Sequence, residues 1–202
     1  MTAVLNEAAT TVTPVTLSPA SLRNALSACL LTAARASNAL PVLEAVHVAK
    51  TGDQLVFRST DRYQLVVVTV TLQGAPDGDW TTLIPAVDAK RAVTALPKTA
   101  RDLVIATIAP DTIDLPGVST LRFLPQDGDF PRTAQIIPTV TEPVEEIDLS
   151  TKSLADLARM PGRSANEPVR LVFAGPQKPV RCEWGNDDVR YLYLLMPTKI
   201  AD

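Results

Sequence analysis

The sequence is poor in the residues that build metal sites, disulfide frameworks and most catalytic centres. Its 202 residues contain one histidine, two cysteines and only 4% aromatic side chains. A single histidine gives no basis for a histidine metal site. The two distant cysteines, Cys29 and Cys182, favour buried thiols in a reducing compartment over a disulfide. We therefore expect no metal and no cofactor, and an aliphatic core.

Long apolar runs and a leader-like start are also missing. No stretch approaches the ~20 apolar residues that a membrane span requires. Residues 1–13 lack the basic start and the apolar run of a signal peptide and are rich in threonine and alanine, so we expect a flexible N-terminus and a cytoplasmic protein. The remaining composition, 46% apolar and 20% charged, is typical of a globular protein with a real core.

Signatures of catalysis are absent from the sequence. There is no P-loop, no dinucleotide-binding glycine motif and no nucleophile elbow. The lone His47 stands in the middle of a strand pattern, and Cys29 falls on an apolar helix face, where a core role is more common than a nucleophilic one. The acidic pairs Asp187-Asp188 and Glu145-Glu146 are interpreted as solubilising charge. We expect that the protein is not an enzyme.

An apolar strand close to the C-terminus is the most informative feature that is present. Residues 190–200 read RYLYLLMPTKI, and such a segment must join a sheet to keep its leucines out of water. Met196-Pro197 interrupts the ladder, because proline has no N–H to donate. With an unpaired edge, this strand is predicted to form one wall of a peptide-binding groove.

The chain also repeats one order of elements, β-α-β-β-β, three times. Each repeat is predicted from a strand, a helix-start signal such as Ser18-Pro19 or Ser150, and three further strands. The first repeat comprises strands 14–17, 43–49, 54–59 and 64–73 with helix 20–36. The second comprises strands 80–85, 103–108, 112–115 and 119–124 with helix 88–97, and the third comprises strands 146–149, 169–174, 180–184 and 191–195 with helix 151–160.

All three predicted helical segments are basic, although the whole chain carries a net charge of −3. Segment 20–36 contains no acidic residue, segment 88–101 contains only Asp88, and segment 151–163 contains only Asp156. Any one basic helix is explained by lysine and arginine being good helix formers on a solvated face. Three together favour a single basic surface of helices on an acidic body, which suits a phosphate backbone.

Three motifs together resemble the bacterial DNA polymerase III beta subunit, the replicative sliding clamp. They are STDRYQL at 59–65, GDFPRTAQIIP at 128–138 and YLLMPTKI at 193–200. In that family a T-D-x-x-x-L turn is followed by an F-P-x-x-x-x-h-h-P linker, where h is apolar, and the chain finishes on Y-h-h-M-P-h-[KR]-h. Each motif alone is weakly specific, and their shared order makes the resemblance specific. It covers nearly everything from residue 14 to residue 200.

The resemblance implies an α+β protein with the DNA-clamp fold, in which three β-α-β-β-β units place their helices on one inner face and antiparallel sheets outside. It divides the chain into a flexible N-terminus (1–13), a complete clamp domain of two units (14–127), an interdomain linker (128–144) and a half clamp domain of one unit (145–202). The protein thus looks like a shortened, phage-encoded member of the family.

The resemblance further implies that helices line a hole around double-stranded DNA, which they contact through phosphates without sequence preference. The residues expected to face DNA are Arg23, Arg35, Lys90, Arg91, Lys98, Arg101, Lys152, Arg159 and Arg163. For the cations near helix ends, a structural role is the alternative interpretation.

Clamps also bind DNA polymerase and other proteins through short motifs that enter an apolar cleft. By motif position, the cleft residues here are Leu43, Thr60, Arg62, Tyr63, Gln64, Leu65, Pro131, Gln135, Ile136, Leu194, Leu195, Met196 and Pro197. For Leu43 and Leu65 a plain core role is the competing interpretation. The pair Arg62-Tyr63 and the linker residue Gln135 depart from the family pattern.

A half domain of one unit buries too little surface to be stable alone, which predicts self-assembly. Clamp rings contain twelve such units, so a tetramer ring is favoured, with a dimer or a trimer as alternatives. The leading function is a processivity clamp whose partners include a clamp loader. The second is a clamp-fold adaptor or decoy that binds clamp-binding motifs without encircling DNA. The third is an enzyme on the same scaffold.

Overall fold

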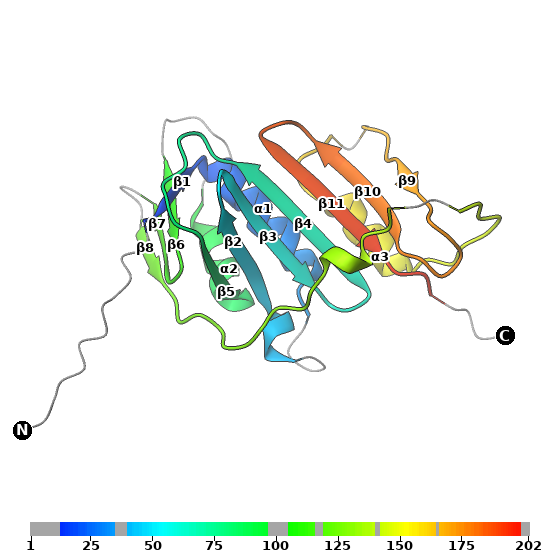
Figure 1. Cartoon of the computed structure of the whole chain (residues 1–202), viewed down its shortest axis with the longest axis horizontal. Helices are drawn as coiled ribbons and strands as arrows, with labels where there is room; N and C mark the ends of the chain where they lie inside the picture. The colour runs from blue at the N-terminus through cyan, green and yellow to red at the C-terminus, as the bar shows by residue number, and fades with distance from the viewer. Residues whose placement is uncertain are drawn as a thin grey trace, which may run out of the picture.

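The computed structural model describes residues 13–34, 40–96, 105–115, 119–139, 142–164 and 166–198, which form three helices and two antiparallel sheets (Figure 1). The first repeat is β1 (Val15–Leu17), α1 (Pro19–Thr32), η1 (Pro41–Glu44), β2 (Ala45–Thr51), β3 (Gln54–Thr60) and β4 (Gln64–Thr71). The second is β5 (Trp80–Pro85), α2 (Ala86–Ala95), β6 (Ala106–Ala109), β7 (Thr112–Leu115) and β8 (Ser119–Arg122). After η2 (Ala134–Ile136) follow α3 (Thr151–Arg159), β9 (Leu171–Val172), β10 (Val180–Gly185) and β11 (Val189–Leu195).

The first two repeats exchange their first strands. The four-stranded sheet has the order β1-β6-β7-β8, and the seven-stranded sheet has the order β5-β2-β3-β4-β11-β10-β9. Strand β1 therefore pairs with the second repeat, with Val15 opposite Ile108, while β5 pairs with the first, with Ile84 opposite Val46. We call β1–β8 with their helices the paired units and α3–β11 the third unit.

The three helices lie together on one side of the two sheets, behind them in Figure 1. Ser18 caps α1 by accepting a hydrogen bond from the amide of Ser21, and Pro19 occupies its first turn, as the sequence predicted. Helix α1 packs against β3, β4 and α2, and Leu22 and Phe57 are fully buried in the core between them. The predicted α+β architecture, with helices on one face and antiparallel sheets on the other, is confirmed.

Strand β11 lies inside the seven-stranded sheet, so the expectation of an unpaired edge was wrong. It pairs with β10 on one side and with β4 on the other, where all seven of its residues have a partner, from Val189 opposite Val70 to Leu195 opposite Gln64. The apolar side chains at the end of the strand need this double pairing to stay out of water. The third unit is thus joined to the paired units by a continuous ladder.

The predicted strand 146–149 is not formed. The segment runs without regular structure up to the N-cap of α3, and its Asp148 carbonyl accepts a hydrogen bond from the amide of Thr198. The physical reason lies in the strand exchange: a first strand of this fold pairs with the sheet of a neighbouring unit, as β1 and β5 do. Within the described residues the third unit has no such neighbour.

The linker crosses the face of the seven-stranded sheet opposite the helices (Figure 1). The amide of Gln126 donates to the Leu83 carbonyl of β5, and the Phe130 ring stacks on His47 of β2 at 5.0 Å between centroids. Burial, followed by the charge of Arg58, lowers the pKa of His47 to about 4, so the histidine is neutral and serves as a packing surface. At the far end Arg181 of β10 donates to the Pro138 carbonyl.

Candidate functional site

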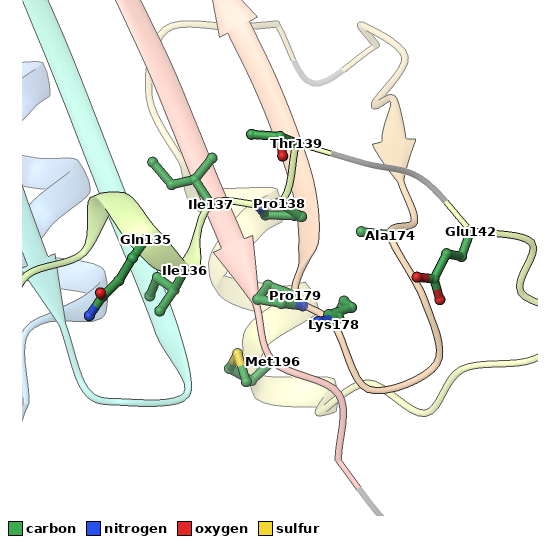
Figure 2. Close-up of a pocket in the computed structure, with 10 residues that line it drawn as sticks. All are labelled: Gln135, Ile136, Ile137, Pro138, Thr139, Glu142, Ala174, Lys178, Pro179 and Met196. Carbon is green, nitrogen blue, oxygen red and sulfur yellow. The ribbon is translucent and has the colours of Figure 1, made fainter.

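A cavity of about 470 Å³ opens where the linker meets the residues that follow β11. We call it the linker–tail groove. Figure 2 shows linker residues and Met196 gathered around Pro179 and Lys178. Three of the predicted cleft residues, Gln135, Ile136 and Met196, line it, and the full lining is Gln135, Ile136, Ile137, Pro138, Thr139, Glu142, Ala174, Lys178, Pro179 and Met196. Ile136 is 42% exposed, unusually open for so apolar a side chain.

The other predicted cleft residues do not line this cavity. Pro131, Arg62 and Tyr63 are exposed and Pro197 is partly buried beside Met196, whereas six residues are buried in the sheet below. The buried set is Leu43, Thr60, Gln64, Leu65, Leu194 and Leu195. The burial of Leu43 and Leu65 favours the core interpretation of these two residues.

The turn between β3 and β4 holds Tyr63 at the surface near the tail. The Asp61 carboxylate accepts hydrogen bonds from the amides of Tyr63 and Gln64, at 3.0 and 2.8 Å. Arg62 adopts a left-handed backbone conformation with φ of 81°, which turns the chain sharply. The Tyr63 carbonyl accepts from the amide of Met196 at 2.9 Å, so the turn and the tail are fixed side by side. The 63% exposed Tyr63 is thereby available to a ligand.

A polar network joins the third unit to the paired units. The hydroxyl of fully buried Tyr193 lies within hydrogen-bond distance of the Gln64 side-chain oxygen and, at 3.0 Å, of the Ser153 carbonyl of α3. Gln64 in turn donates to Asp61. Burial, then the nearby carboxylates of Asp156 and Asp61, raises the pKa of Tyr193, so its hydroxyl keeps the proton that these contacts use.

The far wall of the groove was missed from the sequence. Glu142, Ala174, Lys178 and Pro179 belong to segments that the predicted motifs do not include. A signal for two of them did exist: pairing strand 180–184 with strand 191–195 puts the residue before Val180 beside the residue after Leu195. That register places Pro179 next to Met196, and the turn 175–178 brings in Lys178.

The cations predicted to face DNA fall into three groups. Arg35, Lys98 and Arg101 lie outside the described residues. Arg23 and Arg163 are engaged within the protein: Arg23 donates to the Val93 and Leu96 carbonyls at the end of α2, and Arg163 donates to the Leu157 carbonyl and stacks over Trp184 at 5.3 Å. The exposed cations on the helices are Lys90, Arg91, Lys152 and Arg159.

The exposed cations of α3 share one buried acid. The Asp156 side chain is only 2% exposed and accepts hydrogen bonds from Lys152 at 2.8 Å and from Arg159. Burial alone would raise the pKa of Asp156, but the hydrogen bonds and charges of Lys152 and Arg159 hold it below its ordinary value. On α2, Arg91 pairs with Asp88 at 2.8 Å, and a shallow hollow of about 420 Å³ runs along Val87, Lys90, Arg91, Thr94 and Ala95.

Other classes of site are not indicated. Cys29 and Cys182 are free, buried thiols, as predicted, and burial raises the pKa of each to about 12, which keeps them protonated and unreactive. Among the described residues no cluster of histidine, cysteine and acidic side chains could hold a metal ion. None of the described helices is long and apolar enough to cross a membrane.

Comparison with known proteins gives no match to a protein-family model or to a curated protein. Solved structures do match. A DNA polymerase sliding clamp from Pseudomonas aeruginosa superposes with a TM-score of 0.76 at 16% identity over 93% of this chain, and the sliding clamp from Bacillus subtilis with 0.75 at 15% identity over 95%. The DNA polymerase III beta subunit from Thermotoga maritima gives 0.72 at 13% identity over 93%. The match covers 66–67% of each longer chain. The protein therefore has the fold of the bacterial DNA polymerase III beta sliding clamps, in a shorter chain.

Proposed function

We propose that this protein is a non-enzymatic sliding clamp, a ring that encircles double-stranded DNA and tethers a DNA polymerase. The observation that carries the proposal is the linker–tail groove, open and lined by Ile136 and Met196, on a sliding-clamp fold whose helices share one face. With three units in the chain, four copies would supply a twelve-unit ring. A clamp loader is then a further expected partner.

The groove would take a short peptide motif with apolar side chains. Ile136 and Met196 offer apolar contact area, and the backbone carbonyl of exposed Tyr63 accepts a hydrogen bond from the Met196 amide. Glu142 and Lys178 on the far wall carry opposite charges, so a bound peptide meets both signs. Burying a few apolar anchors in a largely preformed groove is an effective way to hold a flexible partner.

The DNA contacts would come from the exposed cations Lys90, Arg91, Lys152 and Arg159, together with Arg35, Lys98 and Arg101. The first four are exposed positive charges on helices, which suits phosphate contacts that do not read sequence. Asp88 and Asp156 reduce their net field, so each contact is weak. Weak contacts let a ring move along the duplex while its closure keeps it attached.

The same neutralisation favours a second candidate, a clamp-fold adaptor that binds the motif without encircling DNA. Arg23 and Arg163 are taken up inside the protein, Asp156 offsets two cations, and the whole chain is acidic at −3. If the remaining cations add little to this field, the protein would bind linear DNA poorly. The two candidates differ in whether attachment depends on the topology of the DNA.

The test of the proposed function is retention on circular DNA. After loading on a nicked circle, the protein should co-elute with the DNA in gel filtration and should be lost when the circle is cut once. A mutant of the ring interface serves as the control that cannot stay closed. Equal retention on circular and linear DNA would contradict encirclement, and binding of the motif without any retention would support the adaptor.

The groove is tested separately with a labelled clamp-binding peptide. Ile136→Ala and Met196→Ala should each weaken peptide binding by about tenfold, because apolar anchors at the centre of an interface carry most of its affinity. Leu124→Ala is the matched control, since Leu124 is apolar and 86% exposed but lies away from the groove lining. Unchanged affinity in both groove variants would show that the peptide binds elsewhere.

A further inference from the structure

The start of the third unit repeats the start of the first. Residues 15–22 read VTLSPASL and residues 147–154 read IDLSTKSL, with identical leucines and serines at 17/149, 18/150, 21/153 and 22/154. The structure supports this alignment independently, because Ser18 is the N-cap of α1 and Ser150 is the N-cap of α3. The two segments are therefore equivalent, and their surroundings can be compared residue by residue.

The equivalent residues have very different exposure. Leu22 is completely buried in the core that the paired units share, whereas its equivalent Leu154 is 41% exposed. Val15 is 1% exposed in β1, whereas its equivalent Ile147 is only partly buried and lies outside any strand. The third unit thus carries the apolar residues of a covered unit, but they are only partly covered: Ile147 packs against the core of its own chain, and Leu154 is exposed.

Strand β9, at the edge of the seven-stranded sheet, also lacks a strand on its outer side among the described residues. Strand β9 ends the seven-stranded sheet, and Val169 just before it is 41% exposed. In the paired units the corresponding strands β2 and β6 each take the first strand of the other unit, β5 and β1. An open edge next to exposed valine is a site that another strand readily joins.

The exposed face of α3 fits a close helix neighbour. Leu154, Ala155 and Ala158 share one side of the helix, and the two alanines allow close approach. In the paired units Arg23, the equivalent of Ala155, reaches across from α1 to the terminal carbonyls of α2. The third unit needs no such arginine, because its own Arg163 already donates to the Leu157 carbonyl at the end of α3.

We propose that the third units of two copies of this chain pair about a two-fold axis and exchange residues 146–149, each segment adding a strand beside β9 of the other copy. The occupant is a second copy because the third unit holds both halves of the contact, a donor segment and an acceptor edge. One two-fold operation therefore satisfies both. The paired units provide the template for this exchange. The proposal rests on the repeat and does not require the proposed role on DNA.

Sedimentation velocity and hydrogen exchange test this pairing. The full chain should associate at micromolar concentration, and the amides of 146–149 should exchange more slowly as the concentration rises. Leu154→Arg on the helix face and Val169→Lys at the sheet edge should each weaken association by about tenfold or more, because a symmetric interface contains every substitution twice. In both variants, amides 146–149 should exchange at the rate of the dilute protein.

The matched control is Ile105→Arg, which places the same charge on an apolar residue that is 55% exposed in the paired units. It should leave association unchanged. Peptide binding in the linker–tail groove, measured on the same variants, separates this proposal from the proposed function: it should persist in Leu154→Arg and Val169→Lys. A wild-type chain that stays monomeric, or association that ignores both variants and leaves 146–149 unprotected, would overturn the pairing.

Discussion

The paired units and the third unit share one apolar core, but each of the paired units has a first strand that pairs with the other, whereas the third unit has none among the described residues. The paired units share an apolar core, in which Leu22, Phe57 and Ile108 are fully buried, and they exchange strands β1 and β5. The third unit has a single helix of nine residues, and a large part of its attachment is the β4–β11 ladder with a polar network around Tyr193 and Asp156. The comparison teaches that a clamp unit is completed by its neighbour.

The equivalent leucines give the largest contrast. Leu22→Ala should lower the free energy of unfolding by about 2–5 kcal/mol, because it opens a cavity in a fully buried core. Leu154→Ala should lower it by less than about 1 kcal/mol in the dilute protein, because a half-exposed side chain loses little contact. Urea unfolding at low protein concentration measures both. Equal losses would show that the third unit already buries Leu154.

Asp156, the buried acid of α3, should contribute more to the free energy of unfolding than Asp88 on α2. Asp156→Asn should cost about 1–2 kcal/mol at pH 7, because the variant loses charge-assisted hydrogen bonds from Lys152 and Arg159 to a buried carboxylate. Asp88→Asn, which breaks the exposed pair with Arg91, should cost no more than about 0.5 kcal/mol. Thermal unfolding of the two variants against the wild type gives both differences.

The stability difference between the wild type and Asp156→Asn should depend on pH. The pKa of Asp156 is lowered in the folded protein, so its contribution is fully present above the ordinary carboxyl value of 3.8 and is lost as the pH falls through the lower folded value. The difference between wild type and Asp156→Asn should therefore shrink as the solution is acidified below pH 3.8. A difference that stays constant on acidification would mean that the charge of Asp156 does not stabilise α3.

Loss of the Tyr193 hydroxyl should destabilise the protein less than loss of the Leu22 side chain. Tyr193→Phe should cost about 1 kcal/mol, because it takes a hydrogen-bond partner from the buried Gln64 side chain and from the Ser153 carbonyl. Tyr191→Phe is the control, since it keeps the ring that stacks on Trp184 at 5.1 Å. Hydrogen exchange along β4 and β11 should be faster in Tyr193→Phe only, and equal exchange in both variants would contradict a junction held by this hydroxyl.

Local signals in the sequence predicted most of the elements. Ser18 caps α1 through a short-range hydrogen bond, Ser150 occupies the N-cap position of α3, and β5 and β7 have the predicted bounds. The segment 146–149 was wrongly predicted as a strand, because strand formation depends on a partner that its own residues do not specify. For the same reason, the sequence of β11 did not predict that the strand would pair on both sides.

The candidate site was predicted in outline. Gln135, Ile136 and Met196, which the linker and tail motifs had suggested, line one cavity, whereas Glu142 lies at its wall through loop geometry that no sequence pattern predicts. The charge pattern predicted basic helices. That pattern does not predict the hydrogen bond from Arg23 to the end of α2, because contacts between helices join residues that are distant in sequence.

The most direct test of the account is an image of the assembled protein. Negative-stain particles of the full chain should show a closed ring of four copies, with a central hole wide enough for double-stranded DNA and two-fold contacts between third units. The Leu154→Arg variant should give open fragments in place of rings. Wild-type particles without a central hole, at a concentration where the protein is fully associated, would contradict the ring.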